Sequence, residues 1–346
     1  MNNNIAMRAV RCCMMALLIG VVACGEQHNT EPELLVYSAR NEHLIKPLFD
    51  RFTQNTGIQI RYVTDKAGPL LSRLQAEGEN SPADLLLTVD AGNLWQAANM
   101  GVLAPIESPI LIRNVPAHLR DQDNQWFALT IRARTLVFNT DKLAPADLSS
   151  YEALAEETWQ NRLCLRTSKK VYNQSLVATM IASLGVDRVE QIVAGWVANL
   201  ALPPLANDTA VMEAVALNQC DVGIVNTYYY SRIMAQKPAL PLALFWPNQR
   251  GKGVVARGVH VNVSGAGVVR ASHNKEQAQQ LIEWLTSEEA QQILMDLNQE
   301  YPVNDAVALN AELAAWGEFK ADSVDVSEAG RLQVEAAKLM DRVRYR

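Results

Sequence analysis

Three consecutive tyrosines, Tyr228, Tyr229 and Tyr230, are the residues whose type and spacing could do the most distinctive chemistry in this chain. They follow the apolar run 220–225, typical of a short buried strand, and precede residues 231–235, which have the pattern of a helix. In open α/β sheets, ligands bind where strands lead into helices. A phenol has an ordinary pKa of about 10, so only a highly charged, hard cation would keep it ionised at neutral pH. Three phenolates would balance a trivalent ion such as Fe³⁺, whereas the alternative is that the tyrosines are packing residues with hydrated hydroxyls.

The start of the chain has the features of an export signal. Arg8 and Arg11 precede an apolar run, residues 14–23, that is too short to span a bilayer. The run ends directly before Cys24, and this junction resembles a bacterial lipoprotein signal, which is cleaved before a cysteine that then carries lipid. An ordinary secretory peptide cut near Ala23 is the alternative.

The mature protein is therefore expected in the periplasm. Residues 1–23 are predicted to be the signal peptide and residues 24–33 a polar tether, anchored by lipid at Cys24. No later stretch has about 18 consecutive apolar residues, so no spanning helix is expected.

Export also bears on the two cysteines that remain, Cys164 and Cys220. Two cysteines in an oxidising compartment can pair, and each of these lies in an apolar, strand-like run. A disulfide between them is predicted, with two buried free thiols as the alternative. No CxxC or HxxxH pattern accompanies them, so a metal site built on the cysteines is not expected.

The charge balance argues against nucleic acid as a partner. The net charge of the chain is −6, and it becomes about −8 when the two arginines of the signal leave with it. An acidic chain of this kind suits a protein that binds a cation or a small molecule.

Strand-like and helix-like segments alternate along the chain, with no internal repeat and no low-complexity tract. This alternation predicts an α/β fold with parallel sheets and crossover helices. The expected strands are 34–38, 58–63, 84–89, 135–138, 163–165, 220–225, 242–245 and 260–263. The expected helices are 44–56, 69–76, 92–98, 151–157, 173–184, 186–200, 209–217, 231–235, 275–285 and 288–297, followed by a helical tail from residue 306. Two lobes joined by extended crossings near 128–138 and 246–262 would fit this order, and a small ligand usually binds in the cleft between such lobes.

Six segments in this order resemble the periplasmic iron-binding proteins of bacterial ABC transporters, in the group that uses several tyrosines. The resemblance runs from about residue 34 to residue 304, and its most specific segments are 36–40 (VYSAR), 83–92 (ADLLLTVDAG), 132–134 (RAR), 171–175 (VYNQS), 226–230 (NTYYY) and 300–304 (EYPVN). The resemblance implies a two-lobed type II periplasmic binding protein with a hinged inter-lobe cleft.

The boundaries of the lobes follow from the same resemblance. Lobe 1 is expected to contain residues 34–130 plus 256–304, and lobe 2 residues 131–255. Residues 305–346 are expected to form C-terminal helices packed on the lobes.

The resemblance also implies which residues bind iron. Tyr172 of the YNQS segment and the adjacent Tyr228 and Tyr229 match the family's ligand tyrosines. Two adjacent tyrosines suffice in relatives, so Tyr230 is only a further candidate. Three phenolates from one lobe would hold the ion while the other lobe closes over it.

In lobe 1 this chain departs from the family pattern. Many relatives have a histidine after the first strand, where this chain has Asn41, and Glu42 or His43 could contribute instead. The departure favours a shell completed by an anion such as carbonate or bicarbonate, or by water. Arg40 and Arg132 resemble the positions that hold this anion in relatives, and a guanidinium suits planar carbonate; surface ion pairs are the alternative for both.

The function implied by the resemblance is that of a monomeric substrate-binding protein of an ABC importer. It would capture Fe³⁺ and deliver it to an inner-membrane permease and its ATPase. The alternatives are the same fold used for an organic solute, an oxyanion or a polyamine, and a hydrolase. The chain has no HExxH, GxSxG or P-loop motif, so we expect no enzyme.

Overall fold

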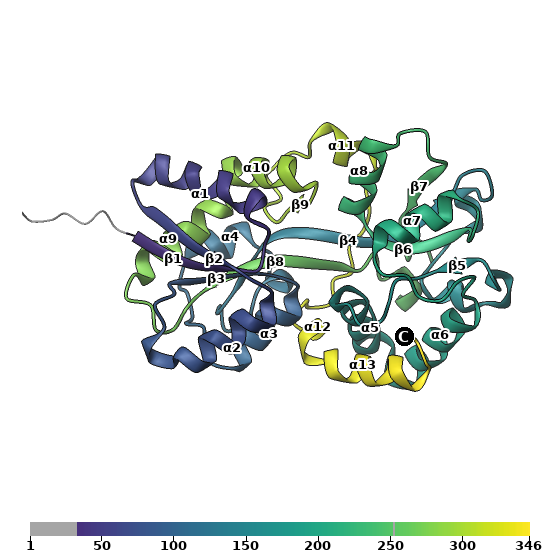
Figure 1. The fold of residues 1–346 in the computed structure, drawn as a ribbon, viewed down its shortest axis with the longest axis horizontal. Helices are drawn as coiled ribbons and strands as arrows, with labels where there is room; N and C mark the ends of the chain where they lie inside the picture. Colours follow the sequence, from purple (N-terminus) through teal and green to yellow (C-terminus); the bar gives the residue numbers. More distant parts are fainter. Residues whose placement is uncertain (1–32, 252) are drawn as a thin grey trace, which may run out of the picture. The chain divides into compact units, whose positions relative to one another are not determined.

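The computed structural model describes residues 33–251 and 253–346 (Figure 1). The predicted signal peptide, the lipidation site Cys24 and all but the last residue of the predicted tether lie outside the described residues. Within the described ranges, no helix is long and apolar enough to serve as a membrane span.

The strands are β1 (Glu33–Ser38), β2 (Gln59–Thr64), β3 (Leu85–Val89), β4 (Phe127–Asn139), β5 (Leu163–Cys164), β6 (Val222–Asn226), β7 (Leu242–Phe245), β8 (Val261–Val268) and β9 (Tyr301–Pro302). The α-helices are α1 (Glu42–Thr56), α2 (Ala67–Glu77), α3 (Ala91–Asn99), α4 (Pro109–Asn114), α5 (Val171–Leu184), α6 (Val186–Ala198), α7 (Asp208–Ala216), α8 (Thr227–Gln236), α9 (Lys275–Leu285), α10 (Glu288–Asn298), α11 (Ala311–Ala315), α12 (Glu328–Arg331) and α13 (Gln333–Arg342). The 3₁₀-helices cover Gly78–Asn80, Ala117–Leu119, Pro145–Asp147, Glu152–Ala155, Glu157–Trp159 and Gly253–Ala256.

Local sequence accounts for the ends of several helices. The carboxylate of Asp90 accepts a hydrogen bond from the N–H of Gly92 at the start of α3, and the amide of Asn207 accepts one from Ala210 at the start of α7. Gly57 ends α1 with a φ of 76°, a left-handed conformation that glycine adopts at little cost.

The described strands form one sheet in the order β2-β1-β3-β8-β4-β6-β5, with β7 and β9 also paired to β4. β1 is parallel to β2 and β3, and β5 is parallel to β6. All pairs made by β4 and β8 within the described chain are antiparallel. The alternation of strands and helices predicts a parallel sheet, but the observed sheet is mixed. The reason is that the chain reaches β8 through an extended segment and not through a crossover helix.

Strand β4 connects the two halves of the sheet (Figure 1). Residues 127–133 of β4 pair with β8, and residues 134–138 pair with β6. The sequence predicts only the short strand 135–138, because the arginines at 132 and 134 interrupt the apolar pattern. Two residues apart on a strand, Arg132 and Arg134 share one face, and both are buried.

Each half of the sheet has its own hydrophobic core. One core contains Leu34, Leu86, Trp126 and Val263, and the other contains Leu136, Trp196 and Ile224. The two cores account for the separate lobes that the sequence suggests.

The segment after residue 305 is less helical than predicted. Only residues 311–315, 328–331 and 333–342 are helical there. Helix α12 packs against both α3 and α5, and its Gly330 lies so close to Trp95 of α3 that a Cβ atom on the glycine would approach the Cβ of Trp95 to 2.6 Å. Helix α13 packs on α5 and α6. The tail is divided into short helices because α12 packs on α3 and α5, whereas α13 packs on α5 and α6.

Two further predictions need local correction. The predicted helix 151–157 consists of two 3₁₀ turns, separated by Glu156 in an extended conformation. The predicted strand 260–263 extends to Val268, because Gly265 and Gly267 sit directly against the backbone of the neighbouring segment at Phe127 and Gln125, where a side chain would not fit.

Cys164 and Cys220 form a disulfide in the structure, with their Cα atoms 5.9 Å apart. Cys164 ends β5 and Cys220 lies two residues before β6, and both are buried. The bridge ties together the two parallel strands whose ends lead toward Arg166 and the tyrosine triplet.

Candidate metal centre

Three tyrosines occupy the first turns of two helices. Tyr172 is the second residue of α5, and Tyr228 and Tyr229 are the second and third residues of α8. The sequence predicts that these helices begin later, at residues 173 and 231; the structure includes the tyrosines in both. A helix N-terminus carries a partial positive charge, which favours a negatively charged phenolate beside it.

A buried ion-pair network holds both helix starts. The carboxylate of Asp208 accepts hydrogen bonds from Arg134 Nη1 at 3.1 Å, from Arg166 Nη1 at 3.0 Å and from the N–H of Asn226 at 2.9 Å. Arg134 Nη2 donates to Asn173 Oδ1 at 2.6 Å. Because Asn173 follows Tyr172 and Asn226 precedes the triplet, the network connects the two chain segments that carry the phenols. Removing one partner of such a network typically costs about 3–5 kcal/mol.

The phenol of Tyr345, near the C-terminus, completes this network. It donates to the carbonyl of Arg166 at 2.6 Å and accepts from Asn173 Nδ2 at 2.8 Å. The C-terminal segment thus supports the start of α5.

Arginines surround the three phenols. The guanidinium carbons of Arg132 and Arg166 lie 5.7 and 5.2 Å from the centre of the Tyr172 ring. The guanidinium carbon of Arg232 lies 5.1 Å from the Tyr228 ring. Positive charges at this range favour the ionised form of a phenol.

The surroundings of Tyr228 disfavour its ionised form when no cation is bound. Burial raises the pKa of Tyr228 well above 10, the neighbouring phenols of Tyr172 and Tyr229 raise it further, and Arg132 opposes the shift. The rings of Tyr228 and Tyr229 are 4.4 Å apart, centre to centre. For Arg166, burial works against the charge, but Asp208 and Tyr229 raise the pKa of the guanidinium above its ordinary value. Without a cation, Tyr228 is therefore a neutral phenol that keeps its proton.

Tyr230 lies apart from these three phenols. Its hydroxyl donates to the carbonyl of Leu242 at 3.2 Å, and its ring contacts the edge of Trp316. Burial raises its pKa. Tyr230 has the packing role that the sequence offers as the alternative for the whole triplet.

The structure does not bring Glu42 or His43 together with the tyrosines in any described contact. Both lie in the exposed first turn of α1, and Glu42 accepts a hydrogen bond at 2.8 Å from Tyr62 of β2. Within the described residues, no group of three or more His, Cys, Asp or Glu side chains could hold a metal ion.

The two arginines predicted to hold an anion have different surroundings. Both Nη atoms of buried Arg40 contact Glu300, at 3.1 and 3.2 Å. Arg132 is also buried; its Nη2 donates to the carbonyl of Val263 at 2.6 Å, but its Nε has no hydrogen-bond partner within the described residues. Burial alone would raise the pKa of Glu300, but Arg40 and Arg132 hold it below its ordinary value. Arg132 therefore lies between a carboxylate on one side and the phenols on the other.

Several residues of the site are not among the sequence predictions: Arg134, Arg166, Asp208, Asn226, Arg232 and Glu300. Arg134, Asn226 and Glu300 carried a usable signal, because they lie in the segments 132–134, 226–230 and 300–304 that resemble the iron-binding family. The others follow from long-range contacts.

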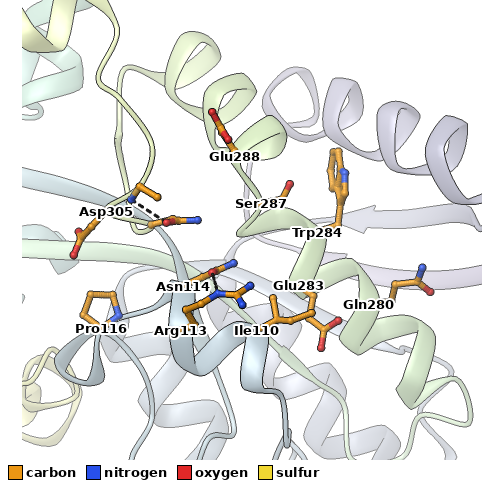
Figure 2. A pocket seen from close by; sticks show the side chains of 12 residues that line it. Ile110, Arg113, Asn114, Pro116, Gln280, Glu283, Trp284, Ser287, Glu288 and Asp305 are labelled. Atoms are coloured by element: carbon orange, nitrogen blue, oxygen red, sulfur yellow. Dashed lines mark hydrogen bonds between the residues drawn. The ribbon is translucent and has the colours of Figure 1, made fainter.

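A wide cavity of about 910 Å³ lies elsewhere, between α4, α9 and α10 (Figure 2). Arg113, Glu283, Trp284 and Glu288 are among its lining residues, which include none of the tyrosines or arginines described above. Size alone does not make it the metal centre.

His260 is a buried residue next to the site, where it lines a small cavity together with Tyr172 and Arg132. Its Nδ1 is 3.0 Å from the hydroxyl of Thr179. Burial, together with Arg134, Arg257 and Arg132, lowers its pKa from 6.5 to about 3. The neutral imidazole is therefore favoured by the folded state.

This shift predicts acid sensitivity. The unfolded chain takes up a proton at His260 near pH 6.5 and the folded chain only near pH 3, so stability falls as the pH drops between these values, by about 1.4 kcal/mol per unit. We expect the free energy of unfolding in urea to fall less between pH 7 and pH 4.5 for His260→Gln than for the parent protein. The same substitution at exposed His273 should leave the loss unchanged; an equal effect of the two variants would contradict the assignment.

The chain is similar in sequence to known proteins. A family model described as bacterial extracellular solute-binding protein matches residues 47–321. Iron uptake protein A1 of Synechocystis sp. is 42% identical over 328 residues, covering 93% of this chain and 89% of the relative.

Two solved structures are similar over most of the chain. A Trichodesmium protein (IdiA, FutA) in complex with iron and citrate ligands has a TM-score of 0.86 at 42% identity, covering 91% of this chain and 100% of that one. Ferric iron-binding protein A of Mannheimia haemolytica, in an open conformation, has a TM-score of 0.83 at 34% identity. The match covers 91% of this chain and 99% of that one.

Proposed function

The chain belongs to the bacterial extracellular solute-binding protein family, and we propose that it captures Fe³⁺ for an ABC importer through the phenolates of Tyr172, Tyr228 and Tyr229. The predicted two-lobed type II periplasmic binding protein fold is confirmed by the likeness to the Trichodesmium and Mannheimia proteins. The names of the relatives describe iron uptake and ferric iron binding, and not catalysis.

One observation carries the ligand assignment. Tyr172 lies far from Tyr228 and Tyr229 in sequence, yet in the folded chain Arg132 lies over the Tyr172 ring, Tyr228 and Tyr229 have ring centres 4.4 Å apart, and both Tyr172 and Tyr229 raise the pKa of Tyr228. They share two helix N-termini and a group of arginines, both of which favour phenolates. Neutral phenols would gain only the cation–π attraction to these arginines, whereas phenolates bound to a trivalent ion would also gain the attraction between opposite charges.

An anion or water is proposed to complete the shell. The unpartnered Nε of buried Arg132 supports a role in holding carbonate, bicarbonate or another carboxylate. At Arg40, an anion would compete with Glu300 for the guanidinium. Glu42 and His43 stay candidates for a ligand from the other lobe, which would require α1 to approach the phenols on closure.

The wider setting of the protein is proposed on the same basis. Residues 34–130 with 256–304 and residues 131–255 would be the two lobes that close on the ion, and the closed form would dock on an inner-membrane permease with its ATPase. A relative from Serratia marcescens named Fe(3+)-binding periplasmic protein supports the compartment. Anchoring through Cys24 and a monomeric state belong to the proposal as well.

Ferric loading tests the function directly. The purified protein, freed of metal and mixed with ferric citrate, should turn orange-red from charge transfer between phenolate and Fe³⁺, and crystals should give an anomalous iron signal beside Tyr228. The proposed Fe³⁺ function would be overturned if the protein stayed colourless and gained thermal stability only from an organic solute, an oxyanion or a polyamine. That result would favour a binding protein of the same fold for a different ligand.

A further inference from the structure

A second cavity, of about 580 Å³, lies on the lobe that carries α8 and has no part in the function proposed above. It is formed by the 3₁₀-helix Pro145–Asp147 and the two residues after it, by the end of β7 with the residues that follow, and by the chain after α11. Its lining residues are Pro145, Ala146, Leu148, Ser149, Leu244, Phe245, Trp246, Gln249, Arg250, Trp316 and Glu318. Cavities of about 300–1,000 Å³ with mainly apolar walls are typical of small-molecule sites.

The aromatic walls of this cavity are held in place by neighbouring rings. Trp246 stacks on Phe319 with 4.4 Å between ring centres, and its Nε1 donates to the carbonyl of Trp316 at 3.0 Å. The Trp316 ring is held by edge contacts with Tyr230 and Tyr301. Helix α11, which leads into Trp316, lies beside α8 in Figure 1. A site with walls fixed in this way is preformed.

Two charges of opposite sign also line the cavity. Arg250 and Glu318 are exposed, and among the described residues neither has an ion-pair partner within 4.0 Å. They therefore do not neutralise each other. Gln249, by contrast, is already used, since its amide accepts from the N–H of Lys320 and donates to its carbonyl.

From this combination we propose that the cavity binds an aromatic α-amino acid. The ring would lie against Trp246 and Trp316, as aromatic rings prefer to stack or meet edge-on. The carboxylate would pair with Arg250, and the ammonium with Glu318. A zwitterion fits two charges that line one cavity without contacting each other, whereas an apolar ligand would leave both unused.

Binding is tested with L-phenylalanine on the full-length, metal-free protein. Calorimetry should give a saturable one-site isotherm. Binding should also change the tryptophan emission when the protein is excited at the red edge of the tryptophan absorption band, where L-phenylalanine does not contribute. Phenylpropionate, which lacks the ammonium, and phenethylamine, which lacks the carboxylate, should each bind about tenfold more weakly. Equal binding of all three compounds, or no binding of L-phenylalanine, would overturn the proposal.

Variants locate the site. Arg250→Gln and Glu318→Gln change exposed side chains, so the fold should be kept, and each should weaken L-phenylalanine about tenfold. The matched controls Arg113→Gln and Glu288→Gln alter the other cavity, shown in Figure 2, and should have no effect. Weakening by the controls, or none by the first pair, would contradict the assignment. Ferric colour should be the same in all four variants, which separates this test from that of the iron site.

Discussion

Tyr229→Phe is expected to abolish the ferric charge-transfer colour and to lower the affinity for Fe³⁺ by at least about a hundredfold. Loss of a hydrogen-bond partner behind a metal ligand can already cost that much, and this change removes a ligand. The ring of phenylalanine keeps the 4.4 Å contact with Tyr228, so the protein should stay folded. Visible spectra and competition with citrate measure the two effects, and an unchanged circular dichroism spectrum with a similar melting temperature checks the fold.

The adjacent residue supplies a matched control. Tyr230→Phe removes a hydroxyl that donates to the carbonyl of Leu242, away from the phenol cluster. Colour and iron affinity should stay within about twofold of the parent protein, with a stability loss of about 1 kcal/mol for the missing hydrogen bond. If Tyr230→Phe lost the colour and Tyr229→Phe kept it, the order of the ligands along α8 would be wrong.

Iron binding is expected to release about three protons, one from each phenol, because a coordinating tyrosine must be deprotonated. Burial and the neighbouring phenols hold the pKa of Tyr228 well above 10, so at pH 7 its proton is present before the metal arrives. Each displaced proton should lower the affinity for free Fe³⁺ about tenfold when the pH falls by one unit. Three displaced protons should therefore lower the affinity about a thousandfold per pH unit.

A pH-stat measures this release during loading with ferric nitrilotriacetate, after subtraction of the protons exchanged by the chelate alone. Tyr229→Phe should release about one proton fewer per bound ion, and Tyr230→Phe the same number as the parent protein. Loading without any release of protons would show that the phenols do not coordinate the ion.

Much of the fold could be predicted from local patterns. The apolar spacing of Leu44, Leu48 and Phe52 is enough to place α1, and Asn207 is enough to mark the start of α7. These features depend on neighbours within one or two turns. The antiparallel course of β8 and the full length of β4 were not predictable in this way, because strand direction and pairing depend on partners far along the chain.

The same division holds for the site. The chemistry was readable from residue types, because phenols are hard ligands only for a highly charged cation, and the segments around Tyr172 and Tyr228 resemble a known family. Arg166 and Asp208 gave no such signal, since each acquires its role only when β5, β6 and α7 are packed together.

What the sequence by itself determined is thus the kind of ligand and the set of tyrosines that could provide it. Which members of the triplet face the other phenols was decided by the tertiary structure, through the position at which α8 begins. Successive residues of a helix are rotated by about 100°, so with Thr227 as the first residue Tyr230 is turned about 200° from Tyr228 and packs against Trp316. If the triplet lay before the helix, as the sequence suggests, helix geometry would not have turned Tyr230 away from Tyr228.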